Sequence, residues 1–295
     1  MINIYEQIDH NKTKSVIVIV SFFVFVMGAA WLISQTSSWG INGVFLALIF
    51  ASVSTLISYY HGDKIALNLS GAHQAERNQE PQLYSAIENL ARTAQIPTPK
   101  AYVSEDQAMN AFATGRNPQN ASVCVTRGLL NNLNQTELEG VIGHEIGHIK
   151  NLDTRLFAIV AVLVGMIAIL SRFAFHTNIG NRGKSRSGGI IPFLGVIAIL
   201  LSPLIGQLIQ LAISRRREFF ADAYSAFLTR QPSGLISALE KLSQNNKPSR
   251  FANNATAHFF IVNPFLTYNK LEGLAKFFNT HPPIEERIAQ LKKMI

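Results

Sequence analysis

The sequence predicts a mainly α-helical integral membrane protein whose polar part contains a small β-sheet. Three observations lead to this prediction. Long uncharged runs are rich in apolar residues, apolar residues recur at helical spacing in a polar segment, and two short runs between turn residues have a strand-like composition. With 48% hydrophobic and 15% charged residues, the chain is also less charged than an average soluble domain.

The first uncharged run lies between Lys14 and Asp63 and is long enough for two membrane-spanning helices. A span needs about 20 mostly apolar residues. Val16–Ile33 and Ile41–Tyr60 meet this requirement, and a polar turn separates them. We therefore expect a polar N-terminal arm over residues 1–15 and a transmembrane hairpin over residues 16–60.

Two further uncharged runs, 156–171 and 187–214, predict a second apolar hairpin over residues 153–214. The first of these runs is short for a span, so the sequence leaves open whether this hairpin crosses the membrane. The positive-inside rule gives a mixed answer. It places both termini and the polar segments in the cytoplasm of an inner-membrane protein, but Arg172, Arg182, Lys184 and Arg186 would then lie outside if the second hairpin spans. The basic residues that give this orientation are Lys12, Lys14, Lys64 and Arg215–Arg217.

The remaining segments, 61–152 and 215–295, are polar and form the two parts of a second unit. Residues 80–95 have apolar residues at helical spacing and predict an amphipathic helix. The strand-like runs are 101–103 and 122–125. Thr136 followed by Glu139 resembles a capping box and predicts the start of a helix that continues to about Lys150.

The most informative motif is His144-Glu145-Ile146-Gly147-His148 on that helix. Residues four apart lie on one helix face, so His144 and His148 can bind the same cation. Glu145 can reach a water molecule on that cation. This is the His-Glu-x-x-His arrangement of zinc peptidases, with two zinc ligands and a general base. The sequence thus predicts one catalytic Zn²⁺ per chain.

A catalytic zinc site needs a third protein ligand. The metzincin pattern requires Gly and His downstream of the motif, where this chain has Asn151 and Thr154. The gluzincin pattern takes a Glu from a second helix, with an Asp one turn later that orients a ligand histidine. Glu218 and Asp222 fit this pattern, so we expect Glu218 as the third ligand and a gluzincin-type metallopeptidase domain.

Four segments in this order resemble the HtpX family of membrane-bound zinc peptidases, which are relatives of the CAAX prenyl endoproteases. The segments are Asn110–Gly115, His144–His148, the arginine-rich run into Glu218 and Asp222, and Thr280–Arg287. The resemblance implies a cytoplasmic zinc site, membrane-associated helices and quality-control cleavage of membrane proteins.

The resemblance also implies roles in substrate binding. Asn110, Ala111, Phe112 and Ala113 would form an edge strand against which the substrate backbone lies, although an ordinary turn is the alternative. His281 would lie on the substrate side and stabilise the oxyanion. The alternative for His281 is a helix start, because Pro-Pro followed by Ile-Glu-Glu begins a helix well.

The function expected from the sequence is hydrolysis of damaged or misfolded membrane proteins by a zinc endopeptidase. A CAAX-type prenyl-protein endoprotease and a non-catalytic membrane protein with a structural metal site are the alternatives. The expected partners are the lipid bilayer and protein substrates. The chain has a net charge of +8, and its basic residues cluster beside the apolar runs. This arrangement favours an anionic membrane surface over nucleic acid as the partner. The sequence does not indicate an oligomeric state.

Overall fold

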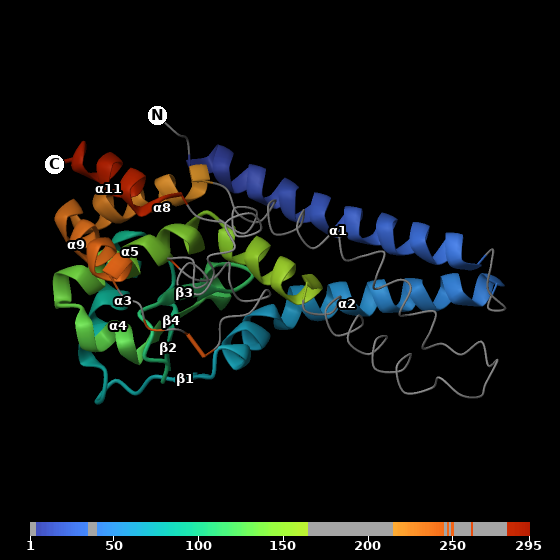
Figure 1. The fold of residues 1–295 in the computed structure, drawn as a ribbon, viewed down its shortest axis with the longest axis horizontal. Coiled ribbons are helices and arrows are strands. Elements are labelled where there is room, and N and C mark those ends of the chain that lie inside the picture. The colour runs from blue at the N-terminus through green and yellow to red at the C-terminus, as the bar shows by residue number, and fades with distance from the viewer. Residues whose placement is uncertain are drawn as a thin grey trace.

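The computed structural model describes residues 4–34, 40–164, 215–244, 247, 249–250, 261 and 282–295. Over these residues the protein is mainly helical with one small sheet (Figure 1). The helices are α1 (Ile4–Ser34), α2 (Gly40–Leu69), α3 (Pro81–Thr93), α4 (Arg127–Asn132), α5 (Gln135–Lys150), α8 (Arg215–Thr229), α9 (Pro232–Gln244) and α11 (Ile284–Lys292). The strands are β1 (Ala72–Gln74), β2 (Lys100–Ser104), β3 (Ala111–Thr114) and β4 (Ser122–Thr126), and a 3-10 turn covers Pro118–Asn120.

Helices α1 and α2 form a long hairpin that projects from the rest of the molecule (Figure 1). Both are long and apolar enough to cross a membrane, over Asn11–Gly28 and Val44–Leu69. Their outward apolar side chains are exposed, as on helices that face lipid: Val20, Val24, Phe45, Ile49, Val53 and Leu56. The arrangement agrees with the predicted first hairpin. From Ile4 onward, however, the expected polar arm is the beginning of α1.

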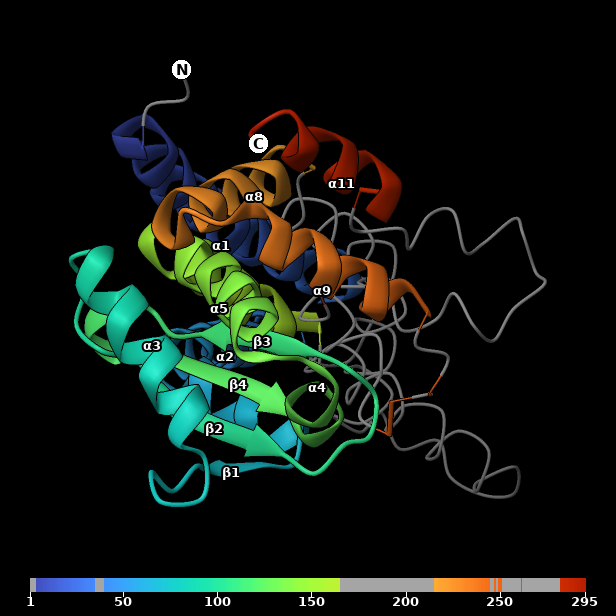
Figure 2. The same cartoon turned by 90° about the vertical axis from the view of Figure 1, so that its left-hand side faces the viewer.

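The sheet has the strand order β1-β2-β4-β3. Strand β2 is parallel to β4, whereas β1 and β3 pair antiparallel with β2 and β4 respectively. Helices α3 and α5 lie against the sheet, and α8 and α9 cover the other side of α5 (Figure 2). Their shared core includes Leu83, Val103, Val123, Ile142, Ile146 and Leu239. The two predicted strands and the predicted helix over residues 80–95 are therefore confirmed.

The capping box of α5 lies two residues before the expected one. Asn134 is its N-cap: the Asn134 side chain accepts a hydrogen bond from the Glu137 amide, and the Glu137 carboxylate accepts one from the Asn134 amide. The predicted pair of Thr136 and Glu139 is wrong. Both candidate pairs have the three-residue spacing of a capping box, and an asparagine caps a helix at least as well as a threonine. The Asn134–Glu137 pair can therefore form the cap in place of Thr136 and Glu139.

A further helical segment, 153–164, follows α5 and packs against the hairpin. Its Leu156 and Val160 share an apolar cluster with Phe22 of α1 and with residues of α2. The contact with α2 is close, because the Ser58 hydroxyl donates to the Ile159 carbonyl over 3.1 Å. Helix α5 is thus joined to the apolar hairpin within a few residues. The rest of the expected second hairpin, 165–214, lies outside the described residues.

Candidate metal centre

The His-Glu-x-x-His motif lies in the interior of α5, in the middle of the core. His144, Glu145 and His148 are all at most 5% exposed. Two apolar residues of α5, Ile142 before the motif and Ile146 within it, belong to the core, and α5 packs against strand β3 and α8. Three polar side chains buried at one place need partners or a ligand, because an unpaired buried polar group is costly.

Glycines on α5 allow α8 to approach it closely. A Cβ atom added at Gly147 would lie 3.2 Å from Ala221 Cα, and one added at Gly143 would lie 2.8 Å from Ser225 Oγ. The Ser225 hydroxyl also donates to the Gly140 carbonyl over 2.6 Å. These contacts fix α8 against the motif, and they bring its Glu218 to the two histidines.

His144, His148 and Glu218 form a compact set of possible metal ligands. The two Nε2 atoms are 3.1 Å apart, and each lies 3.6 Å from a Glu218 carboxylate oxygen. Zinc bonds of 2.0–2.2 Å in tetrahedral geometry place neighbouring donor atoms about 3.3 Å apart. Two imidazoles and one carboxylate at these distances therefore fit a zinc ion that keeps one position open.

Glu145 lies beside this set and contacts the sheet. Its carboxylate is hydrogen-bonded by the backbone amide of Ala113, on strand β3. Burial raises the pKa of Glu145, and the neighbouring Glu218 carboxylate raises it further against the opposing effect of the two histidines. A carboxylate with a raised pKa is a stronger base, which suits it to accept a proton near neutral pH.

Asp222, the residue expected to orient a ligand histidine, contacts His144. Its Oδ1 lies 2.9 Å from His144 Nδ1, which directs Nε2 toward the ligand set. Sequence reasoning missed its partner. Arg287 of α11 is fully buried and donates from Nε and Nη2 to the two Asp222 oxygens over 2.8 and 2.6 Å. Burial raises the pKa of Asp222, but the Arg287 guanidinium outweighs this effect and holds the pKa below its usual value.

Asp153 occupies the corresponding position beside His148, and sequence reasoning assigned it no role. Its Oδ2 lies 2.9 Å from His148 Nδ1. Burial lowers the pKa of His148, but the Asp153 hydrogen bond and the carboxylates of Glu218 and Glu145 outweigh it and raise the pKa to about 9. One sequence signal was available, because Asp153 is the only acidic residue between Glu145 and Glu218.

The segment expected to form an edge strand does so as β3, at the edge of the sheet. It covers Ala111, Phe112 and Ala113, and Asn110 immediately precedes it. The Asn110 side chain accepts a hydrogen bond from the Ile261 amide over 3.0 Å. Strand β3 lies against α5 beside Glu145, whereas His281 lies outside the described residues.

Comparison with known protein families identifies the family of this chain. The family model described as "Peptidase family M48" matches residues 77–295, which include the whole ligand set. The chain belongs to this family. It is accordingly a metalloprotease.

Three relatives that carry the name "Protease HtpX homolog" match nearly the whole chain. The protein of Dictyoglomus turgidum is 41% identical over 98% of this chain and 94% of its own length. The one of Thermoanaerobacter pseudethanolicus is 42% identical, with 99% and 98% covered. The one of Streptococcus gordonii is 39% identical, with 99% and 100% covered. The expected membership of the HtpX family is confirmed.

A crystal structure of S. mikatae Ste24p aligns with 97% of this chain and 66% of that chain. The TM-score is 0.45 and the sequence identity is 18%, which is too weak a likeness to support an argument about this site.

Proposed function

We propose that the protein is a zinc-dependent membrane endopeptidase with one Zn²⁺ held by His144, His148 and Glu218. When bound there, zinc polarises the scissile carbonyl and lowers the pKa of a water molecule to about 7. Glu145 is the general base that takes a proton from the attacking water and passes it to the leaving amine. Asp222 holds His144 in the tautomer that offers Nε2.

The single observation that carries this proposal is the position of the Glu145 carboxylate. It lies beside the three possible ligands and accepts a hydrogen bond from Ala113 on strand β3. A substrate in extended form that adds to this strand would have its backbone beside the base. Asn110, Ala111, Phe112 and Ala113 are the proposed binding residues, and main-chain pairing would accept many sequences. His281 is the proposed oxyanion donor.

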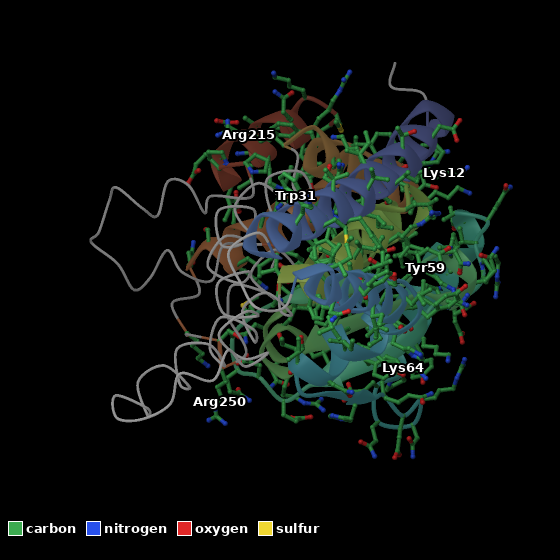
Figure 3. All side chains as sticks on the ribbon, turned by 90° about the vertical axis from the view of Figure 1, so that its right-hand side faces the viewer. Lys12, Trp31, Tyr59, Lys64, Arg215 and Arg250 are labelled. Atoms are coloured by element: carbon green, nitrogen blue, oxygen red, sulfur yellow. The ribbon has the colours of Figure 1, made fainter. Side chains whose placement is uncertain are left out.

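The proposed place of action is the cytoplasmic side of the cell inner membrane, in a multi-pass protein. Two apolar helices support the membrane assignment. Lys12 and Lys64 are exposed at the periphery of the molecule (Figure 3). Lys12 lies in the first part of α1 and Lys64 in the last part of α2, where the hairpin joins the peptidase part (Figure 1). Basic residues at this end favour its placement in the cytoplasm. The resemblance to HtpX suggests quality-control cleavage of membrane proteins as the physiological role.

The proposed base is tested with Glu145→Gln in the purified full-length protein. The amide keeps the shape but cannot accept the proton, so cleavage of casein should fall by about 10²–10⁴-fold. Zinc content should stay that of the wild type, because Glu145 is not a ligand. Cleavage at the wild-type rate would exclude the proposed base. A CAAX-type endoprotease is distinguished by a farnesylated peptide, which it alone would require as substrate.

A further inference from the structure

Asp153 contacts residues of three helices, α5, α1 and α8. It is fully buried and follows α5 by three residues. One of its oxygens, Oδ2, contacts His148 Nδ1 over 2.9 Å. The other, Oδ1, accepts a hydrogen bond from the Asn11 amide of α1 over 2.7 Å and lies 3.4 Å from Arg217 Nε on α8. Arg217 immediately precedes the proposed ligand Glu218.

The contact between Asp153 and His148 selects the form of the imidazole that can bind a cation. A carboxylate accepts hydrogen bonds only, so the hydrogen of neutral His148 resides on Nδ1. The lone pair of Nε2 then faces His144 and Glu218. Such a carboxylate partner fixes both the tautomer and the ring orientation of a ligand histidine. Asp153 therefore does for His148 what Asp222 does for His144.

Asn11 holds Asp153 in place from the first apolar helix. Its side chain is 1% exposed, and Nδ2 donates to Asp153 Oδ1 and to the Asn151 carbonyl over 2.8 Å. These two bonds join residues about 140 positions apart in the sequence. They also fix where α1 meets the end of α5, because a buried amide loses both partners if either helix shifts by one residue.

We propose that Asp153 positions His148 for metal binding and that Asn11 positions Asp153. The first apolar helix is then part of the support of the metal site, and a displacement of α1 changes the metal affinity. Nothing in the His-Glu-x-x-His pattern requires this connection. The inference rests on the proposed ligand set, and its test is separable from the test of that set.

Asp153→Asn is the sharpest variant for the first step. Asn11 and Arg217 both direct donors at the Oδ1 position, so the new amide oxygen is held there. The new NH₂ group then faces His148 Nδ1 and forces the imidazole hydrogen onto Nε2, where it blocks the cation. Loss of a carboxylate that orients a ligand histidine typically lowers metal affinity by about 10–100-fold.

The experiment measures zinc affinity of the full-length protein in detergent, by competition with a chromophoric chelator. Asp153→Asn should lose about 10–100-fold, and Asn11→Ala should lose at least about threefold. Asp9→Asn is the matched control on the exposed face of α1 and should bind like the wild type. Cobalt replacement adds a readout of ligand geometry: the visible spectrum should change in Asp153→Asn and Asn11→Ala but not in the control.

The outcomes separate the inference from the function on which it rests. Wild-type protein that binds no zinc would refute the proposed metal site itself. Wild-type affinity and spectrum in Asp153→Asn would overturn the role of Asp153. Weak binding in Asp153→Asn with wild-type binding in Asn11→Ala would overturn the role of α1. Asn11→Ser replaces Asn11→Ala in the same comparison if the latter does not fold.

Discussion

Arg287 is the largest fully buried side chain among the described residues. Its contribution to stability follows from the carboxylates that it contacts. It forms two hydrogen bonds with Asp222 and lies 3.8 Å from a Glu218 oxygen. Arg287→Met would leave the Asp222 carboxylate buried without its counter-charge. Removing one partner of a buried ion pair costs about 3–5 kcal/mol. Thermal unfolding in detergent should show this loss as a much lower midpoint.

Lys292→Met is the matched control for this prediction. It removes a cation from the same helix, α11, at an exposed position. Surface substitutions of this kind change stability by about 0.5 kcal/mol or less. Equal melting temperatures for Arg287→Met and the wild type would show that the pair with Asp222 contributes nothing.

The motif residues, Glu218 and Asp222 could be identified from the sequence at this scale, but Asp153 and Arg287 could not. The spacing of His144 and His148 determines their shared face on any helix, whatever the fold. Glu218 and Asp222 followed from the same helical spacing. Asp153 and Arg287 become partners only when separate helices pack together, which helical spacing cannot reveal. Arg287 nevertheless shares a helix face with Ile284 and Leu291, an apolar pattern that indicates a buried position.

The start of α5 offers a test at the scale of an element. Glu137 completes the capping box with Asn134, and its carboxylate also accepts hydrogen bonds from Ser237 and Lys241 of α9. Burial raises the pKa of Glu137, but Lys241, Ser237 and the Asn134 amide outweigh burial and lower it below the usual 4.5. The carboxylate therefore stabilises the fold above about pH 4.5, and this contribution is lost as the pH falls through the lowered pKa.

Glu137→Gln should accordingly lower stability at pH 7 by about 1–2 kcal/mol. The difference from the wild type should shrink as the pH falls below 4.5, where the wild-type carboxyl becomes protonated too. Thermal unfolding at several pH values measures both effects, with Glu139→Gln as the control on the same helix. A difference that stays constant down to pH 3 would contradict the role of the charge.

The elements themselves were predictable wherever local signals are strong. Apolar length predicted α1 and α2, and the periodicity after Pro81 predicted α3. Local signals fail where two candidates compete within a few residues, as at the two possible caps of α5. They also do not give the strand order, because the parallel pairing of β2 with β4 depends on contacts between distant segments.

The orientation of the whole molecule can be tested by labelling cysteines in intact cells. Cys124 is fully buried, and burial raises the pKa of its thiol, so it should not react in the folded protein. Single cysteines at Ser37 and Ser243, in a Cys124→Ala background, then report the topology. An impermeant thiol reagent should label position 37 but not position 243, and the reverse pattern would invert the proposed topology.

A cysteine at Ser185 addresses the second apolar hairpin, which lies mostly outside the described residues. Protection in intact cells, with reaction after lysis, is expected if this hairpin stays on the cytoplasmic side. The short run 156–171 favours that outcome. Residues 156–164 are buried against α1, α2 and the sheet, so this run begins beside the first hairpin. Labelling in intact cells would instead show that the hairpin crosses.

The account depends most directly on the metal that His144, His148 and Glu218 hold together. Elemental analysis of the full-length protein, purified in detergent without added metal, measures it. We expect one zinc per chain in the wild type and in Glu145→Gln, and almost none in His148→Ala or Glu218→Ala, because each of these two variants removes one of the three protein ligands that a catalytic zinc site uses. Stoichiometric zinc in His148→Ala would contradict the proposed metal centre.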